Sequence, residues 1–452
     1  MVHVAVDFHK TTGRIKPMHA VGQPPFKGGF LSFDFSHLRH LTNAGIPYSR
    51  LHDVGGAFGA NRYVDIPNLF RDFDADETDP ANYDFAFTDV LIENLYKYDV
   101  KPIFRLGVTI ENQAHIKAYR IYPPKDFGKW ARICEHVIRH YNKGWADGYH
   151  YGIEYWEIWN EPDNGEPGRN QMWIGTPEQY YELYDVAAKH LKACFGDSIK
   201  VGGYGLTSLG GIFYDPEIHG INAKKREKDG KYITAMHRLS FFDGFMDYIQ
   251  QHASPIDFFS WHSYDNVENT AMISEYIDRR FTECGYSDME FHLNEWNVAH
   301  TNALHGTSFA SASCAAMMCK MQESATYMLC YYDTRLIASA YGGFFAPLTY
   351  EPVSTYYAFA AFGKLYELEN QVSCQADGET DGFYALAAAK DEKKAVYLVN
   401  FSEQRRKVKL NMNDHAQVYL IDATHKLEKI EAAASNIEMD ANQVMLIVNK
   451  AL

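Results

Sequence analysis

From about residue 18 to residue 365, short apolar runs alternate with longer amphipathic stretches, and no other feature of this 452-residue chain constrains the fold as strongly. Eight of the runs have the length and composition of buried strands. They are residues 18–22, 48–53, 102–106, 155–160, 200–204, 257–264, 290–295 and 327–333. Strands that alternate with helices form parallel sheets, so this pattern predicts an α/β fold, a (β/α)8 TIM barrel.

The stretches between these runs carry apolar residues at helical spacing. The predicted helices are residues 35–44, 85–98, 130–141, 177–194, 239–251 and 307–325. Asp34 and Asp84 precede two of them as candidate caps. Residues 210–232 are rich in Gly, Lys and Asp, which predicts a loop inserted into the barrel frame.

After about residue 366 the pattern changes to short alternating strands with polar turns between them. The strands expected there are residues 395–401, 407–412, 416–421 and 443–448. They predict an accessory C-terminal antiparallel β-sandwich. Val2, Val4 and Val6 alternate in the same way, so a strand from residues 1–17 is expected to join it. The predicted domains are therefore 18–365 and 366–452, the second completed by 1–17.

The charge balance disfavours several classes of partner. With 43 basic and 58 acidic residues the formal charge is −15, which argues against nucleic acid and anionic membranes. A polyanionic substrate is also disfavoured, unless the chain builds a local pocket of Arg or Lys. No run approaches the roughly 18 apolar residues of a membrane helix. A homo-oligomer is compatible with the sequence, which says nothing more about assembly.

The seven cysteines show no Cys-x-x-Cys spacing, and two of them, Cys314 and Cys319, lie in a predicted buried helix. Free thiols in a reducing compartment are the simplest account. The N-terminus has no basic segment followed by an apolar one, which predicts a cytoplasmic protein. A chain that had lost a signal peptide would give the same sequence.

Two predicted strands end on the same dipeptide, Asn160-Glu161 and Asn294-Glu295, and both pairs are flanked by Trp. The carboxyl ends of barrel strands share one rim, so the two carboxylates are expected to converge across a central pocket. A single Glu at a strand end would be read as a surface charge. Two carboxyl groups on one rim are what glycoside hydrolysis needs: about 5–5.5 Å apart they retain the anomeric configuration, and a wider gap inverts it.

A family resemblance rests on these segments. Residues 156–163 read Trp-Glu-Ile-Trp-Asn-Glu-Pro-Asp, and residues 293–297 read Leu-Asn-Glu-Trp-Asn. In that order they resemble the clan A retaining glycoside hydrolases, and within the clan glycoside hydrolase family 39, which includes β-xylosidases. Supporting matches extend the likeness over nearly the whole chain, at residues 49–52, 200–203, 260–264, 342–344 and 348–350.

The resemblance implies a double displacement with Glu161 as general acid/base and Glu295 as nucleophile. It further implies exo action on β-D-xylosides or related plant-polysaccharide oligosaccharides. Another glycone of arabinose, galactose or glucose type stays open, as does a catalytically silent carbohydrate-binding barrel. No His-Glu-x-x-His or comparable spacing is present, so no metal ion or cofactor is expected.

Several further residues are candidates for substrate binding. Asn160 is the natural partner for the sugar 2-hydroxyl, and Tyr264 for the nucleophile carboxylate. By the resemblance, Arg50 would lie beneath Glu295 and keep it charged; the alternative is an ion pair with another acid of the rim. His52 and His262 could bind sugar hydroxyls, although such residues are more often satisfied core groups.

Two positions depart from the family pattern. The eighth predicted strand carries Tyr332 near its end, where a Trp platform is common. Either a Tyr binds the sugar there or this subsite differs from that of the family. The third strand carries Arg105 where an acidic residue is more familiar, which would change the preferred glycone. Trp159 and Trp296 are platform candidates, but buried packing is the favoured interpretation for both. Glu154 and Glu157 are expected to be structural.

Overall fold

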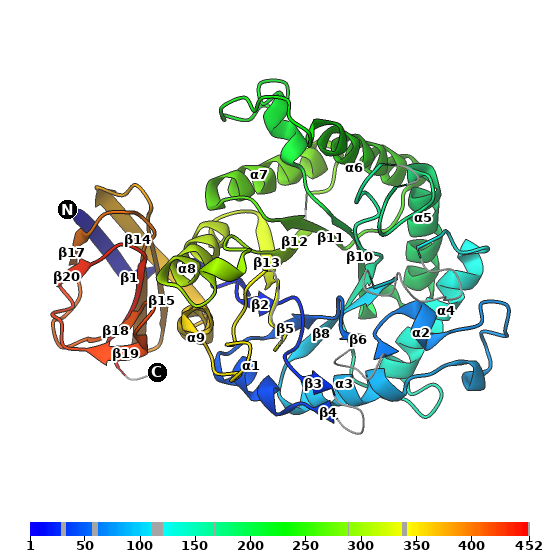
Figure 1. Cartoon of the computed structure of the whole chain (residues 1–452), viewed down its shortest axis with the longest axis horizontal. Coiled ribbons are helices and arrows are strands. Elements are labelled where there is room, and N and C mark those ends of the chain that lie inside the picture. The colour runs from blue at the N-terminus through cyan, green and yellow to red at the C-terminus, as the bar shows by residue number, and fades with distance from the viewer. Residues whose placement is uncertain are drawn as a thin grey trace.

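The computed structural model describes residues 1–28, 33–56, 62–109, 121–166, 169–287, 289–336 and 341–450. Eight parallel strands close into a barrel in the order β10-β11-β12-β13-β2-β5-β8-β9, and the helices surround it (Figure 1). The strands are β2 (Ala20–Val21), β5 (Tyr48–Arg50), β8 (Lys101–Leu106), β9 (Tyr155–Ile158), β10 (Lys200–Leu206), β11 (Phe258–Ser263), β12 (Glu290–Trp296) and β13 (Thr326–Tyr331). The predicted (β/α)8 barrel is confirmed.

Helices cover the outside of the barrel and bury their apolar faces against it. They are α1 (Arg39–Asn43), α2 (Ile66–Leu69), α3 (Ala86–Lys97), α4 (Phe127–Lys143), α5 (Pro177–Phe195), α6 (Tyr232–His252), α7 (Val267–Glu283), α8 (Ser308–Gln322) and α9 (Ser354–Glu367). The start of α5 is fixed locally, because Thr176 and Gln179 form a reciprocal capping box ahead of Pro177. Short 3₁₀ turns and the two-stranded pairs β3 (Lys27–Gly28) with β4 (Phe33–Asp34) and β6 (Gly55–Gly56) with β7 (Arg62–Tyr63) complete the barrel loops.

The sequence pattern missed α7 and α9, and it started α6 too late. The α7 signal was readable, because the Asn266 side chain caps the helix by accepting from the Asn269 backbone amide. The segment expected as a loop at 210–232 contains a 3₁₀ helix, Gly210–Tyr214, and runs into α6 at Tyr232. It forms the projection above α6 and α7 in Figure 1.

The C-terminal module is one continuous nine-stranded sheet in the order β19-β18-β21-β16-β15-β14-β1-β17-β20. Its members are β1 (Val2–Arg14), β14 (Asn370–Gly378), β15 (Phe383–Lys390), β16 (Lys393–Asn400), β17 (Arg406–Leu410), β18 (Gln417–Ile421), β19 (Lys426–Ile430), β20 (Asn436–Met439) and β21 (Gln443–Val448). An accessory C-terminal antiparallel module was predicted and is present. It differs from the expected sandwich because its strands share one hydrogen-bonded sheet, and because β1 pairs with β17 in parallel.

The first strand is an interior strand of this sheet, third from the β20 edge. β1 pairs antiparallel with β14 and parallel with β17, and Val2, Val4 and Val6 point into the apolar core that the curved sheet encloses. On its other side the sheet packs against α8 and α9, which separate it from the barrel (Figure 1). Tyr397 of β16 belongs to the barrel's core cluster, so the two modules share one continuous apolar interior.

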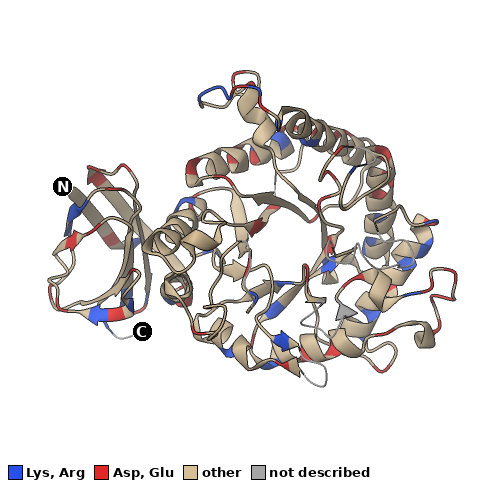
Figure 2. Cartoon of the chain, viewed as in Figure 1, with Lys and Arg blue, Asp and Glu red and all other residues tan. Residues whose placement is uncertain are grey.

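Charged side chains are spread over the outer helices and the sheet (Figure 2). All seven cysteines are free, and Cys314 and Cys319 are buried in α8. Within the described ranges, no helix combines the length and the apolar character that a membrane crossing requires.

Candidate active site

The chain turns sharply just beyond β9, and this turn positions the first carboxylate. The strand ends at Ile158, two residues earlier than predicted, because Trp159 and Glu161 have left-handed backbone angles (φ 72° and 47°) that a strand cannot include. The backbone amide of Glu161 donates to the carbonyls of Tyr204 and Gly205 on β10, at 3.2 and 3.0 Å. A non-glycine residue held in this conformation by its neighbours is typical of functional sites.

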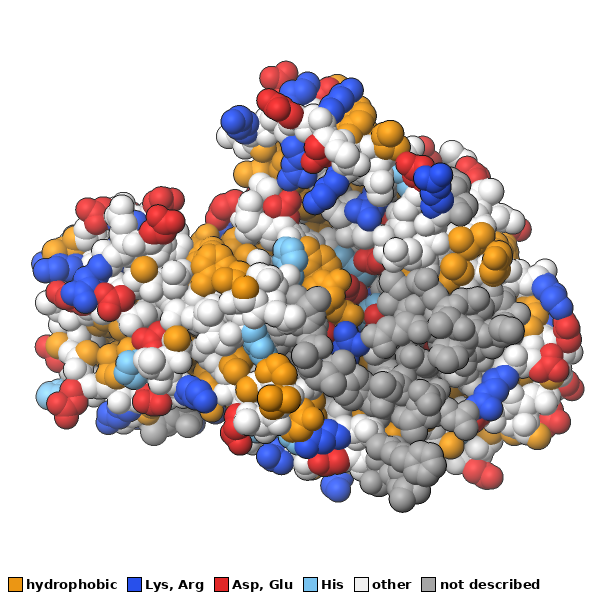
Figure 3. Space-filling model, viewed as in Figure 1, with side chains coloured by type: hydrophobic (Ala, Val, Ile, Leu, Met, Phe, Trp, Pro, Cys, Tyr) orange, Lys and Arg blue, Asp and Glu red, His pale blue; other side chains and the backbone are white. Residues whose placement is uncertain are grey.

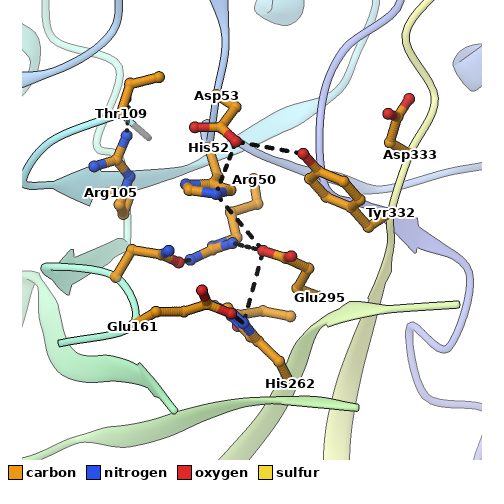
Figure 4. A network of polar contacts seen from close by, with 12 residues as sticks. Arg50, His52, Asp53, Arg105, Thr109, Glu161, His262, Glu295, Tyr332 and Asp333 are labelled. Atoms are coloured by element: carbon orange, nitrogen blue, oxygen red, sulfur yellow. Dashed lines mark hydrogen bonds and ion pairs between the residues drawn. The ribbon is translucent and has the colours of Figure 1, made fainter. Parts of the chain in front are cut away.

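The second carboxylate needs no such turn, because Glu295 lies within β12. His262 of β11 is its neighbour in the strand register. One side-chain atom each of Glu161, His262 and Glu295 lie within 4.8 Å of one another, and Figure 4 shows the three side chains converging. The predicted convergence of the two carboxylates is therefore present in the structure. They line a cavity of about 620 Å³ at the carboxyl ends of the strands.

Glu295 is surrounded by hydrogen-bond donors. The Tyr264 hydroxyl donates to its Oε1 at 2.6 Å, and Arg50 Nη1 lies 3.3 Å from its Oε2. His52 Nε2 is 3.6 Å from the same Oε2. Donors and a permanent cation stabilise the charged form of a carboxyl group. The expected contacts of Tyr264 and Arg50 with Glu295 are thus both found. His52, which was expected to bind a sugar hydroxyl, lies beside the same carboxylate, and its predicted contact with the sugar stays a prediction.

Arg50 also binds a second, deeper carboxylate. Its Nε donates to Glu157 Oε2 at 2.7 Å, and its Nη2 donates to Asn160 Oδ1 at 2.5 Å. Burial raises the pKa of Glu157, but Arg50 and hydrogen bonds from Ser260 and Asn294 outweigh burial and lower that pKa to about 2. The two interpretations of Arg50 are therefore not exclusive: it forms a buried structural pair with Glu157 and contacts Glu295 as well.

The two matching dipeptides place their amides differently. Asn294 Nδ2 donates to Glu157 Oε1 at 2.7 Å, so this amide supports the layer beneath the cavity. Asn160 lines the cavity and accepts from Arg50. Only Asn160 is placed to meet a ligand, and Asn294 is a structural residue that the motif alone did not distinguish.

Glu161 has a different environment. His262 Nδ1 lies 2.8 Å from its Oε1, and Asn164 Nδ2 donates to its Oε2 at 2.6 Å. Burial raises the pKa of Glu161, against the opposing charges of His52, Arg238 and Arg50. Burial also lowers the pKa of His262 to about 4, so its imidazole is neutral near pH 7. A neutral ring and a buried position both favour a protonated Glu161.

Sequence reasoning missed Asp53, which organises the opposite wall (Figure 4). Its Oδ2 lies 3.2 Å from His52 Nε2 and accepts from the Tyr332 hydroxyl at 3.3 Å. Burial opposes ionisation, but the contact with His52 and the charges of Arg335 and Arg105 lower the pKa of Asp53 below its usual range. The side chains of His52 and Tyr332 are therefore fixed through a shared carboxylate, whose sequence signal was its place at the end of the predicted strand 48–53.

Arg105 is buried at the end of β8. Its guanidinium donates to the Val108 carbonyl and to Thr109 Oγ1, the latter at 3.1 Å. Arg105 stays beside the cavity's charged network and is not among the residues that line the cavity. Its predicted influence on the glycone remains a prediction. Trp159 and Trp296 are fully buried, so packing, the favoured interpretation, describes both.

Among the described residues, two side-chain groups have a composition suited to a metal ion. One is Glu161, His262 and Glu295. The other, Glu135 with His190 and Cys194, lies on the outer helices α4 and α5. There Arg139 Nε already pairs with Glu135 Oε1 at 2.6 Å, which supplies the positive charge that an ion would bring. The expectation that the protein uses no metal stays a prediction.

A closed parallel barrel with two carboxylates facing each other at its rim defines the class: an α/β-barrel glycosyl hydrolase. Residues 57–339 match Glycosyl hydrolases family 39, and the chain belongs to this family. A β-xylosidase of Caldicellulosiruptor saccharolyticus is 29% identical over 133 residues, which is 27% of this chain and 25% of that protein. The chain thus spans about a quarter of that relative.

Solved structures share the fold over the full length. A glucosidase from Croceicoccus marinus superposes with a TM-score of 0.75 at 20% identity, covering 100% of this chain and 99% of that one. A family 39 β-xylosidase from Caulobacter crescentus superposes with a TM-score of 0.67 at 15% identity, covering 99% of each chain.

Proposed function

We propose that this protein is a retaining β-glycosidase in which Glu161 is the general acid/base and Glu295 is the nucleophile. The observation that carries the proposal is the closeness of the two side chains, whose facing oxygens lie within 4.8 Å. Retaining enzymes hold their carboxyl groups about 5–5.5 Å apart, whereas inverting enzymes leave about 6.5–9.5 Å for a water molecule. Both side chains are buried, and their polar contacts support the division of roles: Glu295 meets Arg50 and Tyr264, whereas Glu161 meets the neutral His262 and the Asn164 amide.

In the first step, a Glu295 oxygen attacks the anomeric carbon and forms a glycosyl ester. The bond to the leaving oxygen breaks, and Glu161 gives that oxygen its proton. Arg50 and Tyr264 contact the two oxygens of Glu295 and hold the side chain in position for attack. Asn160 lines the cavity, and we assign its amide to the sugar 2-hydroxyl, where a hydrogen bond strengthens as charge develops on the ring.

In the second step, Glu161 accepts a proton from water, and the water oxygen attacks the same carbon and releases Glu295. Esterification has removed the negative charge beside Glu161, which lowers the pKa of Glu161 and suits it to act as a base. Each step inverts the configuration, so the first product keeps the anomer of the substrate.

We assign β-D-xylosides as the first substrates to test, because the partial match to a β-xylosidase includes that sugar in its name. Exo action on these glycosides or on related plant-polysaccharide oligosaccharides belongs to the same proposal. The matching experiment is a panel of aryl β-glycosides with xylose, arabinose, galactose and glucose as glycone. Proton NMR then reads the anomer of the first product.

Two substitutions test the roles. Glu295→Ala should abolish turnover of every aryl glycoside, because no nucleophile remains. Glu161→Ala should still cleave glycosides with activated leaving groups, and azide should restore its turnover by attacking the glycosyl ester. An inverted first product would refute the role of Glu295, and full activity in either variant would refute the pair.

A further inference from the structure

The wall of the cavity beyond Glu161 is basic. Three cations line it: Arg226 and Lys231 from the segment ahead of α6, and Arg238 from α6 itself. In Figure 3, Lys and Arg side chains, with acidic ones among them, lie at the top of the view, where this segment projects. The acidic residue that lines the same wall beyond Glu161 is Asp265, which pairs with Arg226 at 3.3 Å. A chain with a formal charge of −15 thus concentrates positive charge at one side of its cavity.

Hydrogen bonds connect this wall to Glu161. Asn164 Nδ2 donates to Glu161 Oε2 at 2.6 Å, and Asn164 Oδ1 accepts from Arg238 Nη2 at 3.3 Å. In the proposed reaction Glu161 protonates the leaving oxygen, so the leaving group must lie beside Glu161. Arg238 lies on the same side, next to the Asn164 amide. The cations therefore face the leaving group rather than the sugar that is transferred to Glu295.

Arg238 has unused hydrogen-bonding capacity. In the part of the chain that the structure describes, its one hydrogen-bond partner is the amide oxygen of Asn164, and its buried Nε has no partner. The Lys231 side chain has no ion pair among the same residues. A guanidinium with free donors beside a cavity is suited to a planar anion, which it binds through two parallel hydrogen bonds.

We propose that the leaving-group subsite binds a carboxylate, so that the preferred substrate is an oligosaccharide with an acidic sugar on the leaving side. Arg238 would bind the carboxylate directly, with Lys231 and Arg226 adding positive potential. This rests on the proposed function, since the roles of Glu161 and Glu295 define which side is the leaving side.

The test compares two aryl glycosides of the sugar that the panel identifies, one with a 3-carboxyphenyl and one with a neutral 3-carbamoylphenyl leaving group. The measured quantity is the ratio of their kcat/KM values. We expect the ratio to favour the carboxylate in the natural protein and to fall as salt is added. Arg238→Met should lower the ratio by about tenfold, the size of one charge-assisted hydrogen bond. Comparing ratios between variants cancels the difference in leaving-group chemistry.

Lys224→Met is the matched control, because Lys224 is exposed in the same segment and lies outside the cavity lining. It removes the same charge and should leave the ratio unchanged. Arg238→Lys should retain part of the preference, and Lys231→Met should lower the ratio less than Arg238→Met does. Equal ratios for Arg238→Met and Lys224→Met would overturn the proposal while leaving the glycosidase itself intact.

A binding measurement separates this failure from failure of the proposed function. Calorimetric titration compares a disaccharide ending in a uronic acid with its carboxyl-reduced form, and it requires no turnover. Tighter binding of the acid, lost in Arg238→Met, supports the subsite even if no aryl glycoside is cleaved. Equal affinities for the two sugars would refute it.

Discussion

The two carboxylates of the cavity lie within 4.8 Å of each other, yet their surroundings differ in kind. Glu295 meets Tyr264, Arg50 and His52, which are donors or cations. Glu161 is buried beside His262, a neutral ring, and receives one amide donor from Asn164. The distance between two acids therefore does not decide which one carries the charge; the groups behind each of them do.

A second layer of charged side chains lies beneath the cavity. Arg50 is shared between Glu295 and Glu157, and the Glu157 carboxylate is satisfied by Arg50, Ser260 and Asn294. The guanidinium that contacts Glu295 is thus held in place by hydrogen bonds to a carboxylate inside the barrel. On the Glu161 side the neighbouring Asp163 is buried, and burial raises its pKa to about 7.

The largest expected effect comes from removing the shared cation. Arg50→Met leaves Glu157 and Glu295 without their buried partner, so the free energy of unfolding should fall by about 3–5 kcal/mol. Turnover should fall with it, because Glu295 loses a charge partner. Urea denaturation and kcat/KM measure the two effects. Lys200→Met is the control: Lys200 pairs with Glu154 and Glu290 at the opposite end of the strands, partly exposed, and should cost about 1 kcal/mol or less.

Asp163→Asn tests, through the free energy of unfolding, whether the buried Asp163 near Glu161 binds a proton. Folding raises the pKa of Asp163 to about 7, so its stabilising contribution is complete below its unfolded pKa of about 3.9 and is lost as pH rises through about 7. The free energy of unfolding of the natural protein should therefore decline over this window relative to the Asn variant, by up to about 4 kcal/mol. Parallel pH curves for the two proteins would contradict a buried, proton-binding Asp163.

Tyr264→Phe removes one hydrogen bond from Glu295. A hydrogen bond to a charged group contributes about 1.5–3 kcal/mol, so kcat should drop by about ten- to a hundredfold. Tyr332→Phe is the comparison variant: the Tyr332 hydroxyl donates to Asp53 and not to Glu295, so a smaller loss of kcat is expected.

Asn164→Ala changes the surroundings of Glu161 and leaves those of Glu295 unchanged. Asn164 donates to Glu161 and favours its ionised form, so the substitution should raise the pKa of Glu161 further. Since Glu161 must be protonated for the first step, kcat/KM falls as pH rises through its pKa, and the alkaline limb should move upward by about one unit or less. A shift of the acid limb instead would mean that the two roles are exchanged.

The sequence was sufficient to predict the barrel and both carboxylates, because strand ends and their alternation with helices are local patterns. Arg50, Tyr264 and His52 lie at strand ends too, and each is found beside Glu295. Helix α9 was missed for a physical reason: no side chain caps its start, and it is buried between the barrel and the sheet, so its apolar residues do not follow a one-sided helical pattern.

The remaining features depend on contacts that no local pattern encodes. The end of β9 is set by hydrogen bonds from the Glu161 backbone amide to β10, and so lies two residues before the predicted position. Asn294 and Asn160 stand in identical motifs, and only the three-dimensional arrangement around Glu157 and Arg50 separates them. Arg238 is one cation within a helix, and its place beside Asn164 becomes visible only when α6 is folded against the barrel.

The position of β1 has a consequence for synthesis. Val2 pairs with Gly378 on one side and with Val408 on the other, so β1 leaves the ribosome long before either of its neighbouring strands has been made. Until then the apolar face of β1 has no partner, while the residues of the barrel are being translated. Removal of β1 should therefore disturb β14 and β17, which lie far from it in the sequence, before it disturbs the barrel.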